Sequence, residues 1–260
     1  MSSPMQKKIP WIGTGWKMNK LSADAADYET RLAQAEPGTF EEAKVFVLPP
    51  FPYIRDVARI LARTPVSVGG QNMHWIDEGA WTGEISGPML KDCGAALVEI
   101  GHSERRTHFN ETDETVTLKV AAAIRHGLLA LVCIGDTKAE FAAGATAAAL
   151  ERQTRALFQH VPASACANIV IAYEPVWSIG EGGTPASPDF ANDQHLHIKR
   201  LTREICGSEL PVLYGGSVNL ENCRALIAEP KIDGLFIGRA AWQVTGFLDI
   251  IDAVKETAKG

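Results

Sequence analysis

One segment decides how the chain is organised: residues 169–180 read IVIAYEPVWSIG. Its first five residues are an apolar run that predicts a buried strand over 169–173, and Glu174 follows at the C-terminal end of that strand. Residues 181–185 read EGGTP and predict a mobile loop. A carboxylate at a strand end, with a glycine-bearing flap beyond it, suits a base that is sealed from water during reaction. The alternative is an ordinary solvated glutamate.

Short apolar runs of this kind alternate with amphipathic segments along the whole chain. Eight strands are expected, at residues 9–14, 44–48, 66–70, 95–100, 128–134, 169–173, 211–214 and 234–238. Eight helices are expected to follow them, at residues 22–35, 53–63, 85–93, 112–126, 138–160, 187–206, 219–228 and 245–257, with caps at Ser22, Thr112, Ser187 and Asn219. Strands that are apolar on both faces and regularly followed by helices predict an α/β fold, a closed (β/α)8 barrel in which residues 1–260 form a single domain.

The composition excludes several kinds of partner. The 260 residues carry a net charge of −6, which argues against a surface for nucleic acid or for an anionic membrane. No signal-peptide core and no run of membrane-spanning length is present, so a cytoplasmic location is expected. The cysteines are odd in number and scattered, which favours reduced thiols; they are Cys93, Cys133, Cys166, Cys206 and Cys223.

Three ionisable residues are expected at the mouth of the barrel, because the C-terminal ends of its strands converge there. Lys17 follows the first strand, His102 follows the fourth and Glu174 ends the sixth. A carboxylate base, an imidazole and a fixed cation suffice to move a proton between adjacent carbons of a hydroxy-ketone, with no cofactor. Each residue alone has a plainer explanation: a surface lysine, a helix-capping histidine or a solvated glutamate. For Glu104 the alternatives are a carboxylate that holds Lys17 and a structural ion pair, and a structural pair is favoured for Arg105 and Arg106.

Glycine turns after the last two strands predict a phosphate site. Residues 214–218 read YGGSV, with Gly215, Gly216 and Ser217, and the segment Gly238-Arg239 opens a short helical turn. Backbone N–H groups in such turns bind anions when no Cβ blocks the approach. A metal site is not expected, because His195 and His197 point to opposite sides of their predicted helix and have no carboxylate at ligand spacing.

The connection at residues 71–84, QNMHWIDEGAWTGE, is long and has neither helical nor strand period. It carries Met73, Trp75, Ile76 and Trp81, which a monomer would have difficulty burying in a loop. A homodimer is therefore expected, with a contact region that includes Gln71, Asn72, Met73, His74 and Trp75. The alternative is that the loop folds back on its own barrel.

Four segments resemble signature segments of the triosephosphate isomerase family: GWKMN at 15–19, GHSERR at 101–106, YEPVW at 173–177 and YGGSV at 214–218. They match in order and in barrel position, and the resemblance covers the full length of the chain. It implies a TIM barrel, a dimer interlocked through residues 71–84 and a closing loop, which are established features of that family. It also implies that Lys17 stabilises charge, His102 is the electrophile, Glu174 is the base and Glu104 supports them. The phosphate would be bound by Gly180, Ser217, Gly238 and the N–H of Arg239.

Several positions depart from that family's pattern. Gly15 replaces an asparagine, Gly238-Arg239 replaces a glycine pair, the lid reads GEGGTP, and residues 74–75 and 240–242 are also unusual. These features resemble a branch that converts L-erythrulose 1-phosphate to D-erythrulose 4-phosphate in erythritol catabolism. That substrate is dihydroxyacetone phosphate with a hydroxymethyl group on the reacting carbon, and Gly15 would make room for it. The alternatives are a triosephosphate isomerase of glycolysis and gluconeogenesis and a non-catalytic phosphosugar-binding regulator. Retention of Lys17, His102 and Glu174 argues against a regulator.

Overall fold

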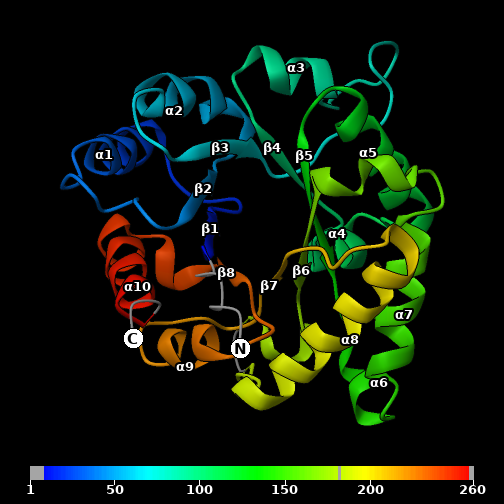
Figure 1. Cartoon of the computed structure of the whole chain (residues 1–260). Coiled ribbons are helices and arrows are strands. Elements are labelled where there is room, and N and C mark those ends of the chain that lie inside the picture. The colour runs from blue at the N-terminus through cyan, green and yellow to red at the C-terminus, as the bar shows by residue number, and fades with distance from the viewer. Residues whose placement is uncertain (1–8, 181–182, 258–260) are drawn as a thin grey trace.

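A computed structural model describes residues 9–180 and 183–257 of the chain. Its eight parallel strands close into a barrel in chain order, and β1 pairs with β8 through Trp11 and Gly234. In Figure 1 the strands form a central ring with the helices outside it. The strands are β1 Trp11–Gly15, β2 Lys44–Leu48, β3 Ser67–Gly70, β4 Leu97–Ile100, β5 Leu129–Ile134, β6 Ile169–Tyr173, β7 Val212–Tyr214 and β8 Gly234–Ile237. The predicted (β/α)8 barrel is confirmed.

The helices that cover the barrel follow the predicted order. They are α1 Ser22–Ala33, α2 Ile54–Leu61, α3 Gly87–Asp92, α4 Ser103–His108, α5 Asp113–Arg125, α6 Lys138–Ala142, α7 Thr146–Leu157, α8 Pro188–Cys206, α9 Cys223–Ala228 and α10 Val244–Thr257. Four 3₁₀ turns accompany them: η1 Phe51–Tyr53, η2 Ala163–Asn168, η3 Val176–Ser178 and η4 Arg239–Ala241. The described residues contain no helix long and apolar enough to cross a membrane.

Two helix predictions were wrong, and helix α4 was not predicted. The expected helix at 138–160 is two helices, α6 and α7, because Gly144 adopts a left-handed conformation (φ +67°) and ends the first. The expected cap Ser22 is the first residue of α1, and the N–H of Leu21 donates to Asp24 instead.

The other expected caps behave differently from one another. The hydroxyls of Thr112 and Ser187 accept backbone N–H groups at the starts of α5 and α8. Asn219 accepts the N–H groups of Glu221 and Asn222 in the turn before α9, which begins only at Cys223.

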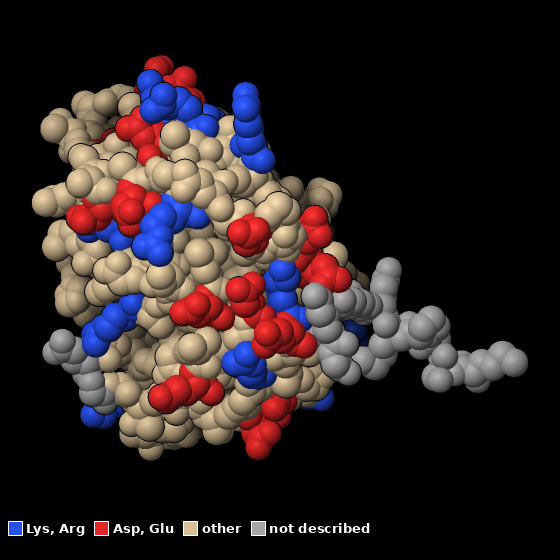
Figure 2. Space-filling model, turned by 90° about the vertical axis from the view of Figure 1, so that its left-hand side faces the viewer, with Lys and Arg blue, Asp and Glu red and all other residues tan. Residues whose placement is uncertain are grey.

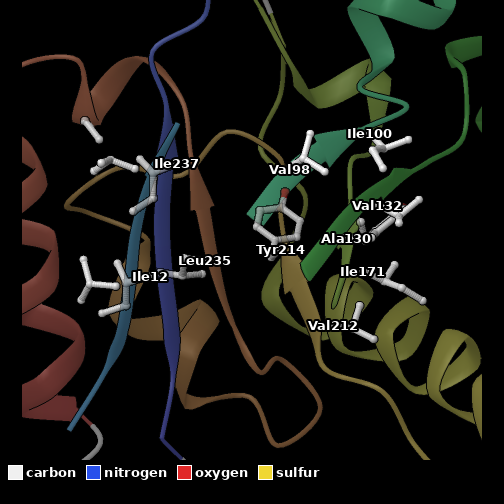
Figure 3. Close-up of a cluster of buried hydrophobic side chains, with 14 of the residues drawn as sticks. Ile12, Val98, Ile100, Ala130, Val132, Ile171, Val212, Tyr214, Leu235 and Ile237 are labelled. Carbon is white, nitrogen blue, oxygen red and sulfur yellow. The ribbon is translucent and has the colours of Figure 1, made fainter. Parts of the chain in front are cut away.

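Alternation along the strands separates two apolar layers. Figure 3 shows the outer one, in which strand residues such as Ile12, Val98 and Val212 belong to the cluster shared with the helices. The inner layer fills the barrel and contains Phe46, Leu48, Leu97, Leu131, Cys133, Val170, Ala172, Leu213 and Phe236. Because side chains alternate in direction along a strand, β4 turns Leu97 and Glu99 inward. A carboxylate therefore lies above an apolar barrel interior.

The segment 71–84 is attached to its own barrel. Met73 is 1% exposed, Asn72 accepts a hydrogen bond from Lys119 (2.8 Å), and Asp77 pairs with Arg125 (2.7 Å). The expectation that Met73 needs a partner subunit is wrong, because the chain buries this side chain itself. Trp81 remains 49% exposed and Ile76 39% exposed.

The cysteines differ from expectation in one pair. Cys166 in η2 and Cys206 at the end of α8 form a disulfide across a sequence separation of 40 residues. Cys93, Cys133 and Cys223 are free. The prediction of reduced thiols is therefore wrong for this pair, because packing brings η2 beside α8, a neighbourhood that cysteine spacing does not reveal.

The surface carries charges of both signs. On the face in Figure 2, acidic and basic side chains are interspersed rather than gathered by sign. Several form ion pairs on the described surface, such as Arg55 with Asp92 (2.6 Å) and Arg224 with Glu256 (2.7 Å). This face therefore offers an anionic ligand no broad basic patch.

Candidate active site

The three predicted ionisable residues lie close together at the C-terminal mouth of the barrel. Lys17 lies two residues past β1, His102 two residues past β4, and Glu174 directly after β6. The His102 Nε2 atom is 3.1 Å from Glu174 Oε1, and Lys17 Nζ is 2.7 Å from Glu104 Oε1. Glu104 Oε2 lies 3.6 Å from His102 Nδ1. The four side chains thus form a connected series, in which Lys17 contacts Glu104, Glu104 lies near His102, and His102 contacts Glu174.

Lys17 is held in an unusual backbone conformation. Its φ of +54° is in the left-handed region, which costs a non-glycine residue about 1 kcal/mol. The side chain of Gln71 donates to the carbonyls of Lys17 (3.1 Å) and Leu48 (2.9 Å), and so fixes this turn to β2. The ammonium is fixed from the other side by Glu104, one of the two roles considered for that carboxylate.

His102 is the N-cap of α4, and its Nδ1 accepts the N–H of Glu104 at 3.2 Å. Burial opposes the charged imidazole, but the carboxylates of Glu174 and Glu99 outweigh it and raise the pKa of His102 to about 9. The hydrogen bond at Nδ1 nevertheless requires an unprotonated nitrogen. We therefore assign the neutral ring with its proton on Nε2, because a second proton would meet a backbone N–H at the positive end of α4.

Glu174 is almost completely buried, at 2% exposure. Burial raises its pKa, but His102 and the N–H of Ser103 more than compensate, so the net pKa lies below the ordinary value. Its Oε2 accepts that N–H at 3.0 Å while Oε1 contacts His102. Because both oxygens already have partners, the carboxylate must exchange one of them to reach a substrate carbon.

The glycine turn after β7 is closely packed. A Cβ on Gly215 would lie 3.1 Å from Cγ of Glu174, and one on Gly216 would overlap the hydroxyl of Tyr214 at 2.3 Å. These glycines therefore leave room for neighbouring side chains, and the phosphate-binding role of their turn stays a prediction. By contrast, apart from its two chain neighbours, no atom of the described residues lies within 4 Å of a Cβ built on Gly238.

The other predicted phosphate ligands lie on the segments that follow β6, β7 and β8. Ser217 donates to the carbonyl of Ser178, Gly180 has a φ of +87°, and Arg239 begins η4 with an exposed side chain. Glu181 and Gly182, in the middle of the predicted flap, lie outside the described residues. Arg105 and Arg106 form ion pairs with Glu111 and Asp113, in agreement with the structural role favoured for them.

A fifth ionisable residue, Glu99, was not predicted. It is 5% exposed, its Oε1 lies 4.0 Å from His102 Nε2, and its Oε2 lies 3.7 Å from the position of a Cβ on Gly15. Burial raises its pKa to about 7, with His102 opposing that rise and Glu174 adding to it. The available signal was a glutamate inside the otherwise apolar run 95–100.

One possible metal-ligand atom from each of Glu99, His102 and Glu174 lies within 4.8 Å of the other two. These atoms are near enough to hold a metal ion, which the sequence did not suggest.

The carboxyl group of Glu99 consequently borders the space beside Gly15. The nearest atoms to a Cβ there are Phe236 Cζ at 3.4 Å and Glu99 Oε2 at 3.7 Å. A separate cavity of about 340 Å³ adjoins Glu174 on the side of Arg106 and Arg152, and its lining does not include Lys17 or His102. We place the candidate active site at the barrel mouth, because the Glu174 carboxylate, the His102 imidazole and the Lys17 ammonium lie there.

A parallel barrel whose mouth brings together a buried carboxylate, an imidazole and an ammonium defines a class of enzyme, the isomerases of phosphorylated sugars. Comparison with known proteins narrows the class. The chain belongs to the triosephosphate isomerase family, whose model matches residues 10–254.

Curated relatives are more specific in their names. L-erythrulose-1-phosphate isomerase of Mesorhizobium japonicum is 53% identical over 244 residues, which cover 94% of this chain and 96% of the relative. The protein of the same name from Brucella abortus (strain 9-941) is 54% identical over 242 residues, covering 93% and 94%. That from Rhizobium meliloti is 51% identical over 251 residues, covering 96% and 98%.

Proposed function

We propose that the protein converts L-erythrulose 1-phosphate to D-erythrulose 4-phosphate; the names of its relatives give this substrate. The observation that carries the proposal is the space beside Gly15, which adjoins Glu99 and is large enough for a Cβ at ordinary contact distances. In the four-carbon substrate the reacting carbon carries a hydroxymethyl group where dihydroxyacetone phosphate carries a hydrogen. A site for the larger substrate needs room at this point.

The proposed reaction moves one proton between two carbons. Glu174 removes the proton from carbon 3, and the electron pair forms an enediolate across carbons 2 and 3. His102 donates from Nε2 to the developing oxyanion and transfers protons between the two oxygens, while the Lys17 ammonium stabilises the negative charge. The proton then returns to carbon 2, which leaves the carbonyl at carbon 3. Substrate and product are both ketoses, and no cofactor or metal ion takes part.

The remaining assignments belong to the same proposal. Gly180, Ser217, Gly238 and the N–H of Arg239 bind the phosphate, and Gly215 and Gly216 shape the turn from β7. Glu104 holds Lys17 in place. One domain forms a homodimer through the exposed Ile76 and Trp81 of the segment 71–84. The enzyme acts in the cytoplasm, in erythritol catabolism.

Turnover of both ketose phosphates by one preparation tests the proposed function. We expect kcat/KM to be higher for L-erythrulose 1-phosphate than for dihydroxyacetone phosphate. The reverse order would make the protein a triosephosphate isomerase, the activity that names the family. Binding of both compounds without turnover of either would indicate a regulator instead. A chelator should leave the rate unchanged, because the proposed steps use only Lys17, His102 and Glu174.

A further inference from the structure

Glu99 lies beneath the reacting groups, and the proposed proton transfer does not use it. It comes from β4, faces the barrel interior and lies at the top of a layer of apolar side chains that includes Leu97 and Phe236. A buried carboxyl group in such surroundings is costly unless a partner satisfies its oxygens. Its position therefore calls for an explanation that packing does not supply.

The two oxygens of Glu99 have different surroundings. Oε1 accepts a weak hydrogen bond from the thiol of Cys133 (3.7 Å) and lies 4.0 Å from His102 Nε2. Oε2 lies 3.7 Å from the position of a Cβ on Gly15 and so faces the space beside that residue. The carboxyl group therefore presents one oxygen to this space as a hydrogen-bond acceptor.

The geometry also relates this acceptor to the base. One carboxylate oxygen of Glu99 lies within 4.8 Å of a carboxylate oxygen of Glu174. A carbon deprotonated by Glu174 must approach that carboxylate closely. A hydroxyl two bonds away from the same carbon is then within reach of Glu99.

We propose that Glu99 binds the terminal hydroxyl of the four-carbon substrate and so selects it over the three-carbon one. The inference rests on the proposed function for the identity of that substrate. Free space beside Gly15 only allows the extra group to fit. A hydrogen-bond acceptor at this space would also bind the hydroxyl of that group and so stabilise the complex. With dihydroxyacetone phosphate, the space beside Glu99 holds no terminal hydroxyl and this hydrogen bond is not made, which weakens transition-state binding.

The test compares two variants and three substrates. Glu99→Leu removes the acceptor, and Glu99→Gln keeps the shape and an amide that can bond to a hydroxyl. The substrates are L-erythrulose 1-phosphate, its 4-deoxy analogue with a methyl in place of the hydroxymethyl group, and dihydroxyacetone phosphate. The parent enzyme should lose about tenfold to a hundredfold in kcat/KM on the 4-deoxy analogue, the loss expected for a hydrogen bond to a charged group. For Glu99→Leu the two four-carbon compounds should react within about threefold of each other, and Glu99→Gln should fall between.

Glu29→Gln is the matched control, because Glu29 is another buried carboxyl, on α1, where it neighbours Asp56 and Arg59 rather than the mouth. It should leave all substrate ratios unchanged, and circular dichroism should show each variant folded. Equal losses on all three substrates in Glu99→Leu would overturn the inference, since Glu99 would then support His102 instead. Equal rates of the parent on the natural and 4-deoxy compounds would overturn it as well. A parent enzyme that prefers dihydroxyacetone phosphate would refute the proposed function itself, whatever the variants do.

Discussion

Replacing Glu99 with glutamine should change how the stability of the protein depends on pH. Burial raises the pKa of Glu99 from an ordinary value of 4.5 to about 7 in the folded chain. Between these values the folded chain retains a proton that the unfolded chain has released. Stability therefore falls as pH rises through this range, because ionising the folded chain must place a charge inside the barrel.

The size of the effect follows from the width of that range. One proton of difference changes the free energy of unfolding by about 1.4 kcal/mol for each pH unit. The range from 4.5 to about 7 therefore corresponds to about 3 kcal/mol, most of it between pH 5 and pH 8. Glu99→Gln has no such proton, so relative to the parent it should gain about 3 kcal/mol over that interval, or roughly 6–12 °C in Tm.

Urea unfolding of both proteins at pH 5 and pH 8, followed by tryptophan fluorescence, measures this gain. Glu221→Gln is a suitable control, because Glu221 lies exposed on the surface, outside the barrel interior. The control should show no pH-dependent gain. If Glu99→Gln and the parent differ by the same amount at both pH values, Glu99 ionises freely in the folded protein, and the reasoning from burial is refuted.

Three further predictions concern the mouth and the proposed dimer. Gly15→Asn should reduce kcat/KM for L-erythrulose 1-phosphate by about 10- to 200-fold and affect dihydroxyacetone phosphate less, because the amide would fill the space in front of Glu99; an unchanged ratio of the two substrates would contradict it. Glu174→Gln should abolish isomerisation while calorimetry still detects sugar-phosphate binding, since the amide cannot accept the proton, and a near-native kcat would exclude Glu174 as the base. Trp81→Asp should shift the protein toward monomer in light scattering, whereas Leu220→Asp, at a similarly exposed apolar residue, should not; a monomeric parent at micromolar concentration would rule out the dimer.

The barrel could be predicted because its strands repeat a signal that is local in the sequence. The strands at 44–48 and 169–173 have the expected bounds, and each of the other six differs by at most two residues at either end. The break at Gly144 was missed because helical periodicity continues on both sides of it. Helix α4 was missed because its six residues, Ser103–His108, are too few to show a period. The disulfide between Cys166 and Cys206 depends on packing between distant segments, which no local pattern encodes.

The candidate site was predictable to the extent that its residues follow strand ends. Lys17, His102 and Glu174 each do so, and the structure brings them together. Glu99 lies inside a strand, so the direction of its side chain depends on the register of β4. Its proposed role also depends on Gly15, which lies across the barrel. The reason for the glycines at 215 and 216 also required coordinates, because the atoms that they accommodate belong to Glu174 and Tyr214.

The juxtaposition of Gly15 and Glu99 has a consequence for how substrate preference evolves on this scaffold. The two residues are far apart in the sequence and lie on strands β1 and β4, which are not paired in the sheet, yet they border the same few ångströms of space. Under the proposed role of Glu99, a single exchange at either position leaves a carboxyl group without room for its ligand, or free space without a hydrogen-bond acceptor. An ancestor that changed its substrate would thus have passed through a poor intermediate unless the two codons changed nearly together. Engineering in either direction should accordingly begin from libraries that vary both positions at once.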